Sequence, residues 1–418
     1  MKRSNSEFRS SQAFPPAVPP GRGIYCNRTL NLRAIQAIGY DMDYTLVHYN
    51  VEEWERCAYE FLRSKLVEQG WPVGDLSFEP DFVVRGLVID KQLGNIVKAN
   101  RFGYIKRATH GRRLLEHDEQ RNIYDRVFVD LSENRWKFLN TFFSQSAACM
   151  YAQLVELLDA GRLPELLGYP QLQERVAMSL DEAHIKGELK ARILEEPHRF
   201  VVLDEQAPQA LLDQKEAGKK LLLITNSEWT YTRHLMEYAF DPFLPGPMTW
   251  RELFDVIVVA ARKPAFFNEH QPIFRVVDNS GLLEPVVGRI RCSGEAYLGG
   301  NAALIEESLG MEGSDILYVG DHIYTDVHVS KGVRRWRTAV MVREIEDELV
   351  AFGDFAPRQR QLDAYMAQKA ALEFEHCQWR LELQRRKMKH PSSSSMYTHS
   401  IHGKLKALRA RLSTLDES

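Results

Sequence analysis

The stretch AIQAIGYDMDYTL, residues 34–46, decides how the rest of the chain is interpreted. Its first half is short and mostly apolar, which is typical of a buried strand. Its second half turns polar and begins with Asp41 and Asp43, two carboxylates spaced two residues apart. In open α/β sheets, ligands bind outside the carboxyl ends of the strands. The stretch therefore predicts a strand that delivers two acidic side chains to a binding site.

Three later runs share this design, in which an apolar stretch is followed at once by polar residues. They are KKLLLITNS at residues 219–227, FDVIVVAARKP at residues 254–264 and DILYVGDHIYTDV at residues 315–327. A fifth run, RTAVMV at residues 337–342, has no such polar tip. Because helical stretches separate the runs, we expect an α/β fold with a mostly parallel sheet. The four polar tips should then meet at one edge of that sheet.

Composition excludes several classes of protein. The 418 residues suffice for two or three domains, and 44% of them are hydrophobic. The net charge of −3 offers no bulk attraction to nucleic acid or to an anionic membrane. The apolar runs are far shorter than the roughly 20 residues of a membrane helix. Five scattered cysteines without CxxC pairing favour a reducing compartment. We therefore predict a cytoplasmic protein that binds neither nucleic acid nor membrane.

The spacing of the runs predicts the domain organisation. About 170 residues separate the first two strands, too many for one crossover helix, so residues 51–199 should form an inserted α+β cap. In this cap we expect a helix at 51–69, strands within 82–108 and helices from about 132 to 194. A Ser- and Pro-rich tail at 1–23 would precede a catalytic core made of residues 24–50 and 200–345.

The last part of the chain, residues 346–418, carries two amphipathic heptad seams around a Ser-rich break. This pattern predicts a C-terminal helical hairpin. The hairpin either packs on its own core or joins two copies of the chain into a homo-oligomer, and the sequence leaves both open.

Asp41 and Asp43 can divide the work of a two-step reaction. One carboxylate can attack an electrophile covalently while its neighbour donates and later removes a proton. The DxDxT pattern is weak by itself, because an aspartate after a strand is often only a turn or helix-cap residue.

The other strand tips offer partners for an anion and for a metal ion. Thr225 and Asn226 supply a hydroxyl and backbone N–H groups, and Lys263 supplies a positive charge. Asp321 and Asp326 supply the hard oxygen ligands that Mg²⁺ prefers alongside substrate phosphate oxygens. Each feature has an ordinary explanation by itself, such as a helix cap or a solvated lysine. Their joint occurrence at successive strand ends favours a catalytic site.

The ordered set DMDYT, ITNS, RKP and GDHIYTD resembles the haloacid dehalogenase (HAD) superfamily of phosphatases, and more narrowly the cytosolic purine 5′-nucleotidase family. The similarity covers about residues 28–345 and includes FVVRGLVIDKQLGNIVKANRFGYI and DEAHIKGELK. The resemblance implies a HAD-type, Rossmann-like core with an inserted cap. It also implies Mg²⁺-dependent hydrolysis of nucleoside 5′-monophosphates, of the inosine or guanosine type, through an aspartyl-phosphate.

The same resemblance implies a role for each motif residue. Asp41 would attack the phosphorus, and Asp43 would protonate the leaving 5′-oxygen and then activate water. Thr225 and Lys263 would hold the phosphoryl oxygens. The implied Mg²⁺ ligands are Asp41, the backbone carbonyl of Asp43, Asp321 and, directly or through water, Asp326.

The substrate side rests on the resemblance alone. Asp181, His184 and Lys190 match the family's nucleoside-contacting residues, although the stretch would otherwise be interpreted as a surface helix. Arg112 and Arg113 stand where the purine enzymes carry an aromatic–Asn pair. Arginine can stack on a base, but a doubly basic patch also suits a more anionic ligand.

Three alternatives therefore stay open. The substrate could be a sugar phosphate or another small phosphomonoester, or the phosphoryl group could pass to a nucleoside in a phosphotransferase reaction. A catalytically silent scaffold is the third, suggested by the hairpin and the tail, and the presence of every motif residue counts against it.

Overall fold

The structure is a computed structural model that describes residues 20–27, 29–83, 86–139, 144–163, 167–185, 188–391 and 394–416, without the side chains of residues 20, 181–185 and 344. The chain divides into two compact units. One unit is Asn31–Met341, and the other combines the described residues before 31 with those after 341. The domain boundaries expected from the sequence stay predictions, since this division marks compactness and not independent folding.

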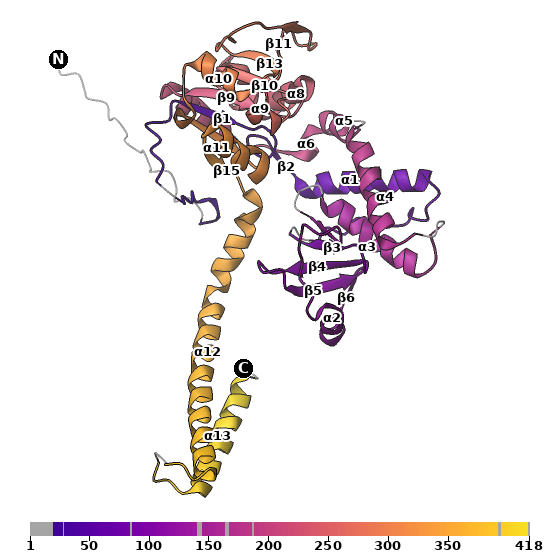
Figure 1. Cartoon of the computed structure of the whole chain (residues 1–418). Coiled ribbons are helices and arrows are strands. Elements are labelled where there is room, and N and C mark those ends of the chain that lie inside the picture. The colour runs from indigo at the N-terminus through magenta and orange to yellow at the C-terminus, as the bar shows by residue number, and fades with distance from the viewer. Residues whose placement is uncertain are drawn as a thin grey trace, which may run out of the picture. The chain divides into compact units, whose positions relative to one another are not determined.

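An eight-stranded sheet forms the centre of the first unit, in the order β12-β11-β13-β10-β9-β1-β14-β15 (Figure 1). Neighbouring strands are parallel, except that β11 runs antiparallel to both β12 and β13. The predicted α/β fold with a mostly parallel sheet is confirmed. The strands are β1 (Ala37–Tyr40), β9 (Lys220–Ile224), β10 (Val256–Val259), β11 (Ile273–Val276), β12 (Leu283–Pro285), β13 (Glu295–Gly299), β14 (Ile316–Gly320) and β15 (Arg337–Val340).

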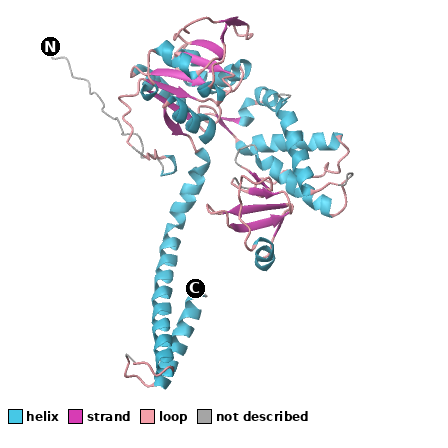
Figure 2. Ribbon diagram, viewed as in Figure 1, coloured by secondary structure: helices cyan, strands magenta, loops and turns pink. Residues whose placement is uncertain are grey.

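Helices pack on the sheet (Figure 2), because its central strands β10, β9, β1 and β14 are buried and apolar on both faces. Leu222 and Tyr318 share one buried cluster with Phe267 of α9, Ile305 of α10 and Val329 of α11. The intervening strand positions point to the opposite face, and α7 packs on β9. The helices of this part are α7 (Gln206–Glu216), α8 (Trp229–Phe240), α9 (Ala265–Asn268), α10 (Ala302–Leu309) and α11 (Val329–Arg334), with short turns η3 (Asp241–Phe243), η4 (Trp250–Leu253), η5 (Gly313–Asp315) and η6 (Ile323–His328).

The insertion leaves the sheet through β2 (His48–Tyr49) and returns through β8 (Val201–Val202). These two strands pair with each other in an antiparallel two-stranded sheet. Between them lie a five-stranded antiparallel sheet, ordered β6-β5-β4-β3-β7, and six helices within the described residues. The elements are α1 (Val51–Glu68), β3 (Val88–Asp90), β4 (Asn95–Ala99), β5 (Ile105–His110), β6 (Arg113–Leu114), α2 (His117–Tyr124), β7 (Trp136–Phe138), α3 (Gln145–Asp159), α4 (Tyr169–Ile185), α5 (Glu188–Glu195) and α6 (Pro197–Phe200).

The insertion is α+β, as the sequence predicts, with one difference. Helices were expected from about residue 132, but residues 136–138 form the edge strand β7, which pairs with β3. Trp136 of that strand is buried against the cluster under the sheet, so tertiary packing decides its conformation. Strands β3 and β4 and helices α1, α3 and α4 enclose the main core of the insertion, including Leu62, Ile89, Val155 and Val176.

The second unit contains α12 (Glu346–Lys387) and α13 (Thr398–Asp416), with the short turns η1 (Pro20–Arg22) and η7 (Arg343–Ile345). Ile401, Leu405 and Leu408 of α13 are buried in this unit, and α13 packs against α12. Arg386 donates to the carbonyls of Ser394 and Met396 and so ties the connecting loop to α12. The predicted helical hairpin is confirmed.

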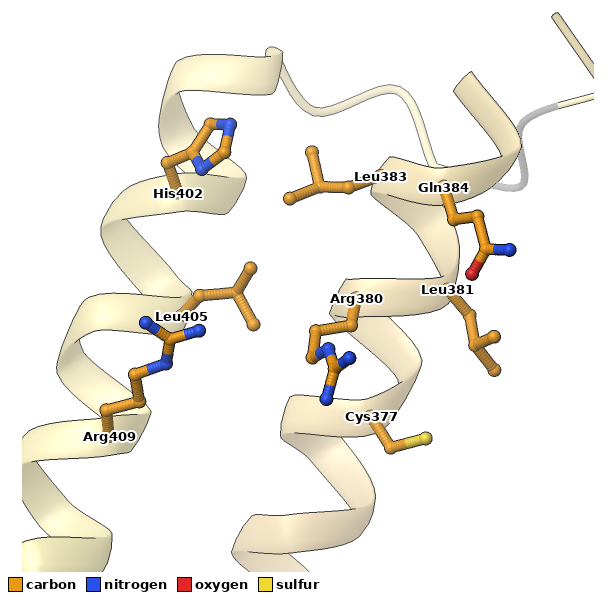
Figure 3. Close-up of a pocket in the computed structure, with 8 residues that line it drawn as sticks. All are labelled: Cys377, Arg380, Leu381, Leu383, Gln384, His402, Leu405 and Arg409. Atoms are coloured by element: carbon orange, nitrogen blue, oxygen red, sulfur yellow. The ribbon is translucent and has the colours of Figure 1, made fainter. Parts of the chain in front are cut away.

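A cavity of about 460 Å³ lies between the two hairpin helices. Figure 3 shows Leu383 and Leu405 pointing toward one another across it, with Arg380 and Arg409 beside them and Cys377 turned away. The cavity is lined by Cys377, Arg380, Leu381, Leu383, Gln384, His402, Leu405 and Arg409. Among the described helices of the chain, none has both the length and the apolar character that crossing a membrane requires.

Candidate active site

The four polar strand tips meet because β10, β9, β1 and β14 are consecutive in the sheet. All four strands are parallel, so their carboxyl ends lie at the same edge. A second cavity, also of about 460 Å³, opens there. The described residues that line it are Asp41, Asp43, Tyr44, Tyr49, Trp54, Lys190, Thr225, Asn226, Ser227, Tyr231, Lys263, Asp321, His322, Thr325 and Asp326.

The loop after β10 is held in an unusual backbone conformation that presents Lys263. Ala260 and Arg262 have φ values of 45° and 59°, in the left-handed region that costs an L-residue roughly 1–2 kcal/mol. Backbone hydrogen bonds from Ala260 to Ser227 (2.8 Å) and from Ala261 to Thr225 (3.0 Å) fix the loop to the end of β9. These contacts stabilise the strained loop, so the position of Lys263 is determined before any ligand binds.

Asn226 completes this arrangement with its side chain. Its Oδ1 accepts from the backbone N–H of Lys263 at 2.6 Å, and its Nδ2 donates to the Lys263 carbonyl at 3.1 Å. Thr225 is fully buried, and its Oγ1 accepts from the backbone N–H of Ser227 at 3.0 Å. The described contacts of the Asn226 side chain are therefore structural, and its substrate-binding role stays a prediction.

The Lys263 ammonium lies at the centre of the site and is almost completely buried. Its Nζ lies 2.8 Å from Asp41 Oδ2 and 2.8 Å from Asp326 Oδ1, and it donates to the Tyr318 hydroxyl at 3.0 Å. Burial alone would lower the pKa of Lys263, but Asp41, Tyr318 and Asp326 hold this pKa well above its usual value. The lysine is therefore charged at any physiological pH.

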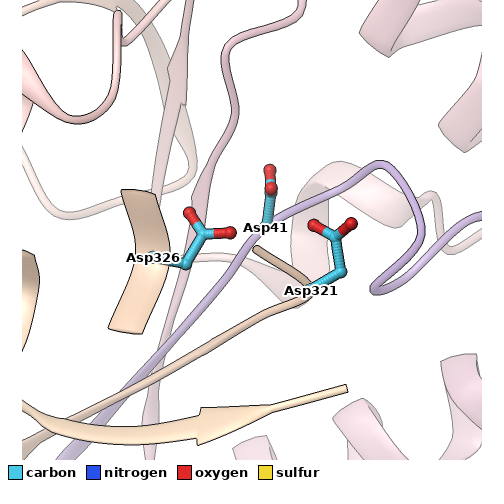
Figure 4. Close-up of side chains that lie close together, drawn as sticks. All are labelled: Asp41, Asp321 and Asp326. Atoms are coloured by element: carbon cyan, nitrogen blue, oxygen red, sulfur yellow. The ribbon is translucent and has the colours of Figure 1, made fainter. Parts of the chain in front are cut away.

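Three carboxylates face one another beside this lysine (Figure 4). Oxygen atoms of Asp41, Asp321 and Asp326 all lie within 4.8 Å of one another. Burial, opposed by Lys263, raises the pKa of Asp41 to about 7. Burial and the neighbouring carboxylates raise the pKa of Asp321 to about 8. One ammonium does not balance three carboxylates, so a divalent cation with oxygen ligands fits this donor set.

Gly320 allows the trio to form. A Cβ at this position would lie 2.6 Å from the Cβ, Cγ and Oδ2 atoms of Asp326. Asp326 is buried, and its Oδ2 accepts from the backbone N–H of His322 at 3.1 Å. The glycine is therefore needed so that the Asp326 carboxylate can lie against the end of β14.

Asp43 accepts hydrogen bonds on both of its carboxylate oxygens. The Tyr49 hydroxyl donates to Oδ1, and the Ser227 hydroxyl donates to Oδ2 at 2.6 Å. The next residue, Tyr44, has φ +56°, which turns the chain sharply after Asp43. The hydrogen-bond partners of the Asp43 carboxylate thus differ from those of Asp41 and Asp326, which both contact Lys263.

Among its described residues, the insertion contributes two side chains to the cavity lining, Trp54 of α1 and Lys190 of α5. Lys190 Nζ lies 3.4 Å from Ser227 Oγ and 4.7 Å from the centre of the Tyr231 ring. Lys190 is thus the one predicted substrate-binding residue of the insertion whose described side chain lines the cavity. Asp181 and His184 belong to α4, but their side chains lie outside the described part of the chain.

Arg112 and Arg113 do not line the cavity, and both make ion pairs within the insertion. Arg112 binds Glu156 at 2.7 Å and Glu79 at 2.5 Å, and Arg113 binds Glu119 at 2.8 Å. With their charges balanced by acidic partners, the two arginines do not form the open basic patch that suggested a more anionic ligand. Their role in substrate binding stays a prediction.

Sequence reasoning missed three residues that contact the expected catalytic side chains, namely Tyr49, Ser227 and Tyr318. It also missed Tyr231, whose hydroxyl lies against that of Tyr49. For Tyr318 a signal was available, since a tyrosine inside a fully buried strand needs a partner for its hydroxyl. Tyr49 lies in a two-residue strand that leaves no periodic pattern in the sequence.

Comparisons with known proteins place the chain in a family. The model of the 5′ nucleotidase family matches residues 24–417. A 5′-nucleotidase domain-containing protein of Dictyostelium discoideum is 28% identical over 350 residues. The match covers 80% of this chain but 57% of that relative, so the chain spans little more than half of the relative's length.

Two solved structures show weaker likeness. CbbY from Rhodobacter sphaeroides in complex with xylulose-(1,5)bisphosphate is 13% identical, with a TM-score of 0.26, covering 74% of this chain and 88% of CbbY. A HAD-superfamily hydrolase of subfamily IA from Geobacter sulfurreducens is also 13% identical, with a TM-score of 0.28, covering 76% of this chain and 97% of that protein. The family match alone spans almost the whole chain, and it confirms the resemblance carried by the four motifs: the chain belongs to the 5′-nucleotidase family.

Proposed function

We propose that this chain is a magnesium-dependent 5′-nucleotidase that hydrolyses nucleoside 5′-monophosphates to a nucleoside and phosphate. The observation that carries the proposal is the pairing of a buried, charged Lys263 with three converging carboxylates at the strand ends. This is an arrangement for binding and stabilising a phosphoryl group through positioning and charge. The family match supports the same class of reaction.

The proposed reaction has two steps, and Asp41 and Asp43 act in both. First, an Asp41 carboxylate oxygen attacks phosphorus, the bond between phosphorus and the 5′-oxygen breaks, and that oxygen takes the proton of Asp43. Second, Asp43 takes a proton from a water molecule whose oxygen attacks the aspartyl-phosphate. The bond between phosphorus and Asp41 then breaks, phosphate leaves, and both side chains return to their starting states.

The remaining side chains hold the phosphoryl group during these steps. Lys263 would neutralise phosphoryl oxygens close to Asp41, and Thr225 would bind them from the end of β9. Asp41, Asp321 and Asp326, with the backbone carbonyl of Asp43, would hold the metal ion. When bound, Mg²⁺ supplies positive charge that offsets the charge of the phosphoryl oxygens and helps to orient the substrate.

For the substrate, we propose a purine nucleotide of the inosine or guanosine type. The family match supports a nucleotide, and the cavity of about 460 Å³ lies within the range of small-ligand sites. The ion pairs of Arg112 and Arg113 remove the observation that favoured a sugar phosphate. The proposal also keeps a cytoplasmic location, supported by five free cysteines.

We also propose that two or more copies of the chain form a homo-oligomer. Five large apolar side chains on the first half of α12 are between 46% and 69% exposed, and they could pack against a second copy. They are Val350, Phe352, Phe355, Leu362 and Met366.

The test is phosphate release from a panel of nucleoside monophosphates and sugar phosphates, measured with Mg²⁺ and with chelator. The same panel is run on Asp41→Asn, whose near-isosteric amide is a poor nucleophile. We expect metal-dependent release from purine monophosphates by the wild type and at least a 1,000-fold loss in the variant, on the order of the loss when a catalytic nucleophile is removed. Activity confined to sugar phosphates would contradict the nucleotidase assignment. Transfer to an added nucleoside that exceeds hydrolysis would point to a phosphotransferase.

A further inference from the structure

The orientation of Asp43 depends on two hydroxyl groups from distant parts of the chain. The Tyr49 hydroxyl donates to Asp43 Oδ1, and the Ser227 hydroxyl donates to Oδ2 at 2.6 Å. A carboxyl group held at one oxygen can still turn about the bond that joins it to Cβ. Donors on both oxygens fix the plane of the group, so this pair sets where each oxygen of Asp43 points.

Tyr49 is itself held rigidly. It is 1% exposed, and its ring centre lies 5.0 Å from that of Tyr44 and 5.1 Å from that of Trp54 in α1. Its hydroxyl lies 3.1 Å from the Tyr231 hydroxyl of α8. The Tyr49 hydroxyl therefore donates to Asp43 from a fixed position.

Tyr49 also stands at the junction between the core and the insertion. It belongs to β2, on which the chain leaves the core, and it pairs with Val201 of β8, on which the chain returns. The second donor has a matching link, because Ser227 Oγ lies 3.4 Å from Lys190 Nζ in the insertion. Each support of the Asp43 carboxyl group is thus in contact with a segment of the insertion or of its connections.

We propose that Tyr49 is a positioning residue that aims the Asp43 carboxyl group at the leaving oxygen of the substrate, with Ser227 as its second support. The inference rests on the proposed function, in which the bond between phosphorus and the leaving oxygen breaks as Asp43 transfers its proton to that oxygen. A misaligned carboxyl group delivers this proton poorly. Attack by Asp41 on phosphorus does not involve Tyr49.

This difference can be measured with two aryl phosphates of nearly equal shape. Phenyl phosphate releases an oxygen that needs a proton at neutral pH, whereas p-nitrophenyl phosphate releases a stable anion that does not. The value of kcat/KM reports only the steps up to leaving-group departure, so hydrolysis of the common aspartyl-phosphate does not contribute. In Tyr49→Phe we expect kcat/KM to fall about 10- to 100-fold for phenyl phosphate and less than about 3-fold for p-nitrophenyl phosphate.

Tyr59→Phe is the matched control. Tyr59 lies in α1, is 1% exposed and donates its hydroxyl to Gln153, away from the cavity lining. This variant should leave the ratio of the two kcat/KM values unchanged. Ser227→Ala is a smaller change and is measured in the same way. It should also lower kcat/KM more for phenyl phosphate than for p-nitrophenyl phosphate. The inference therefore stays testable if Tyr49→Phe does not fold.

An equal loss of kcat/KM on both substrates in Tyr49→Phe would show a merely structural role and overturn the inference. No loss of kcat/KM on either substrate would overturn it as well. The same ratio shift in Tyr59→Phe would overturn it too. Failure of the proposed function has a different signature, since the wild type itself would then release no phosphate from nucleoside monophosphates.

Discussion

Replacing Lys263 with methionine tests whether the lysine charge stabilises the buried carboxylates of Asp41 and Asp326. The change keeps most of the side-chain volume but removes the ammonium that lies 2.8 Å from Asp41 and 2.8 Å from Asp326. The lysine side chain is 2% exposed, so solvent cannot replace it. Breaking a buried ion pair by removing one partner costs about 3–5 kcal/mol. We expect Lys263→Met to lower the free energy of unfolding of the metal-free protein by that amount near pH 8.

The size of this loss should depend on pH in a defined direction. Burial raises the pKa of Asp41 from 3.8 to about 7, so between these values the folded state holds a proton that the unfolded state lacks. The free energy of unfolding therefore falls as pH rises through this window. Without Lys263 the pKa of Asp41 rises further, and the fall continues to higher pH. As pH rises, the difference in the free energy of unfolding between wild type and variant should therefore grow by up to about 1.4 kcal/mol per pH unit.

Urea denaturation in the presence of a chelator, at several pH values, measures this gap. The control is Lys220→Met on β9, where the lysine is 48% exposed and pairs with Asp255 at 2.8 Å. Asp255 itself is buried, but it also accepts from the backbone N–H of Leu221 at 3.0 Å, so it keeps a partner when Lys220 is replaced. Because the lysine end of the pair is half exposed, we expect this control to lose only about 1 kcal/mol. A loss in Lys263→Met that is as small as the control, or that does not change with pH, would refute the charge arrangement derived from the structure.

Three further predictions concern the metal site, the end of β14 and the insertion. Magnesium should raise the melting temperature more at about pH 8 than at about pH 6, because at low pH protons compete for carboxylates with raised pKa values. In Asp321→Asn this Mg²⁺ shift should shrink, and an undiminished shift would place the metal elsewhere. Gly320→Ala should cost about 1–3 kcal/mol in urea denaturation and lower activity, because its Cβ would lie 2.6 Å from Asp326. Gly332→Ala, with no atom within 4 Å of its Cβ, should be neutral or stabilising, and an equal loss there would count against this reasoning. Arg112→Gln should leave kcat/KM for nucleoside monophosphates within about 3-fold, since the guanidinium is engaged with two glutamates. A 10-fold rise in KM would instead show that this arginine turns to the substrate.

Much of the fold could be predicted because its signals are local. The runs at β1, β9, β10, β14 and β15 are short, apolar and bounded by polar residues, which is how a buried parallel strand differs from its surroundings. Strands β11, β12 and β13 escaped notice. β12 is exposed along its length, and β13 begins with Glu295 and ends at a pair of glycines, so neither has a distinctive apolar pattern. The sequence predicts helix at β7, and this is wrong because the conformation of β7 comes from pairing with β3 and not from its own residues.

The sequence by itself determined which residues could do chemistry, since the order of Asp41, Asp43, Thr225, Lys263 and Asp321 along the chain follows from strands that end where polar residues begin. The adjacency of those strands in the sheet then brings the residues together. Only the tertiary structure decided what each side chain touches, because contacts between residues 49, 190, 227 and 318 and the motif residues depend on how distant segments pack. Hydrogen bonds and ion pairs act over about 3 Å, and no pattern along one chain records such distances. For that reason, the partners of Lys263 and the supports of Asp43 came from the structure alone.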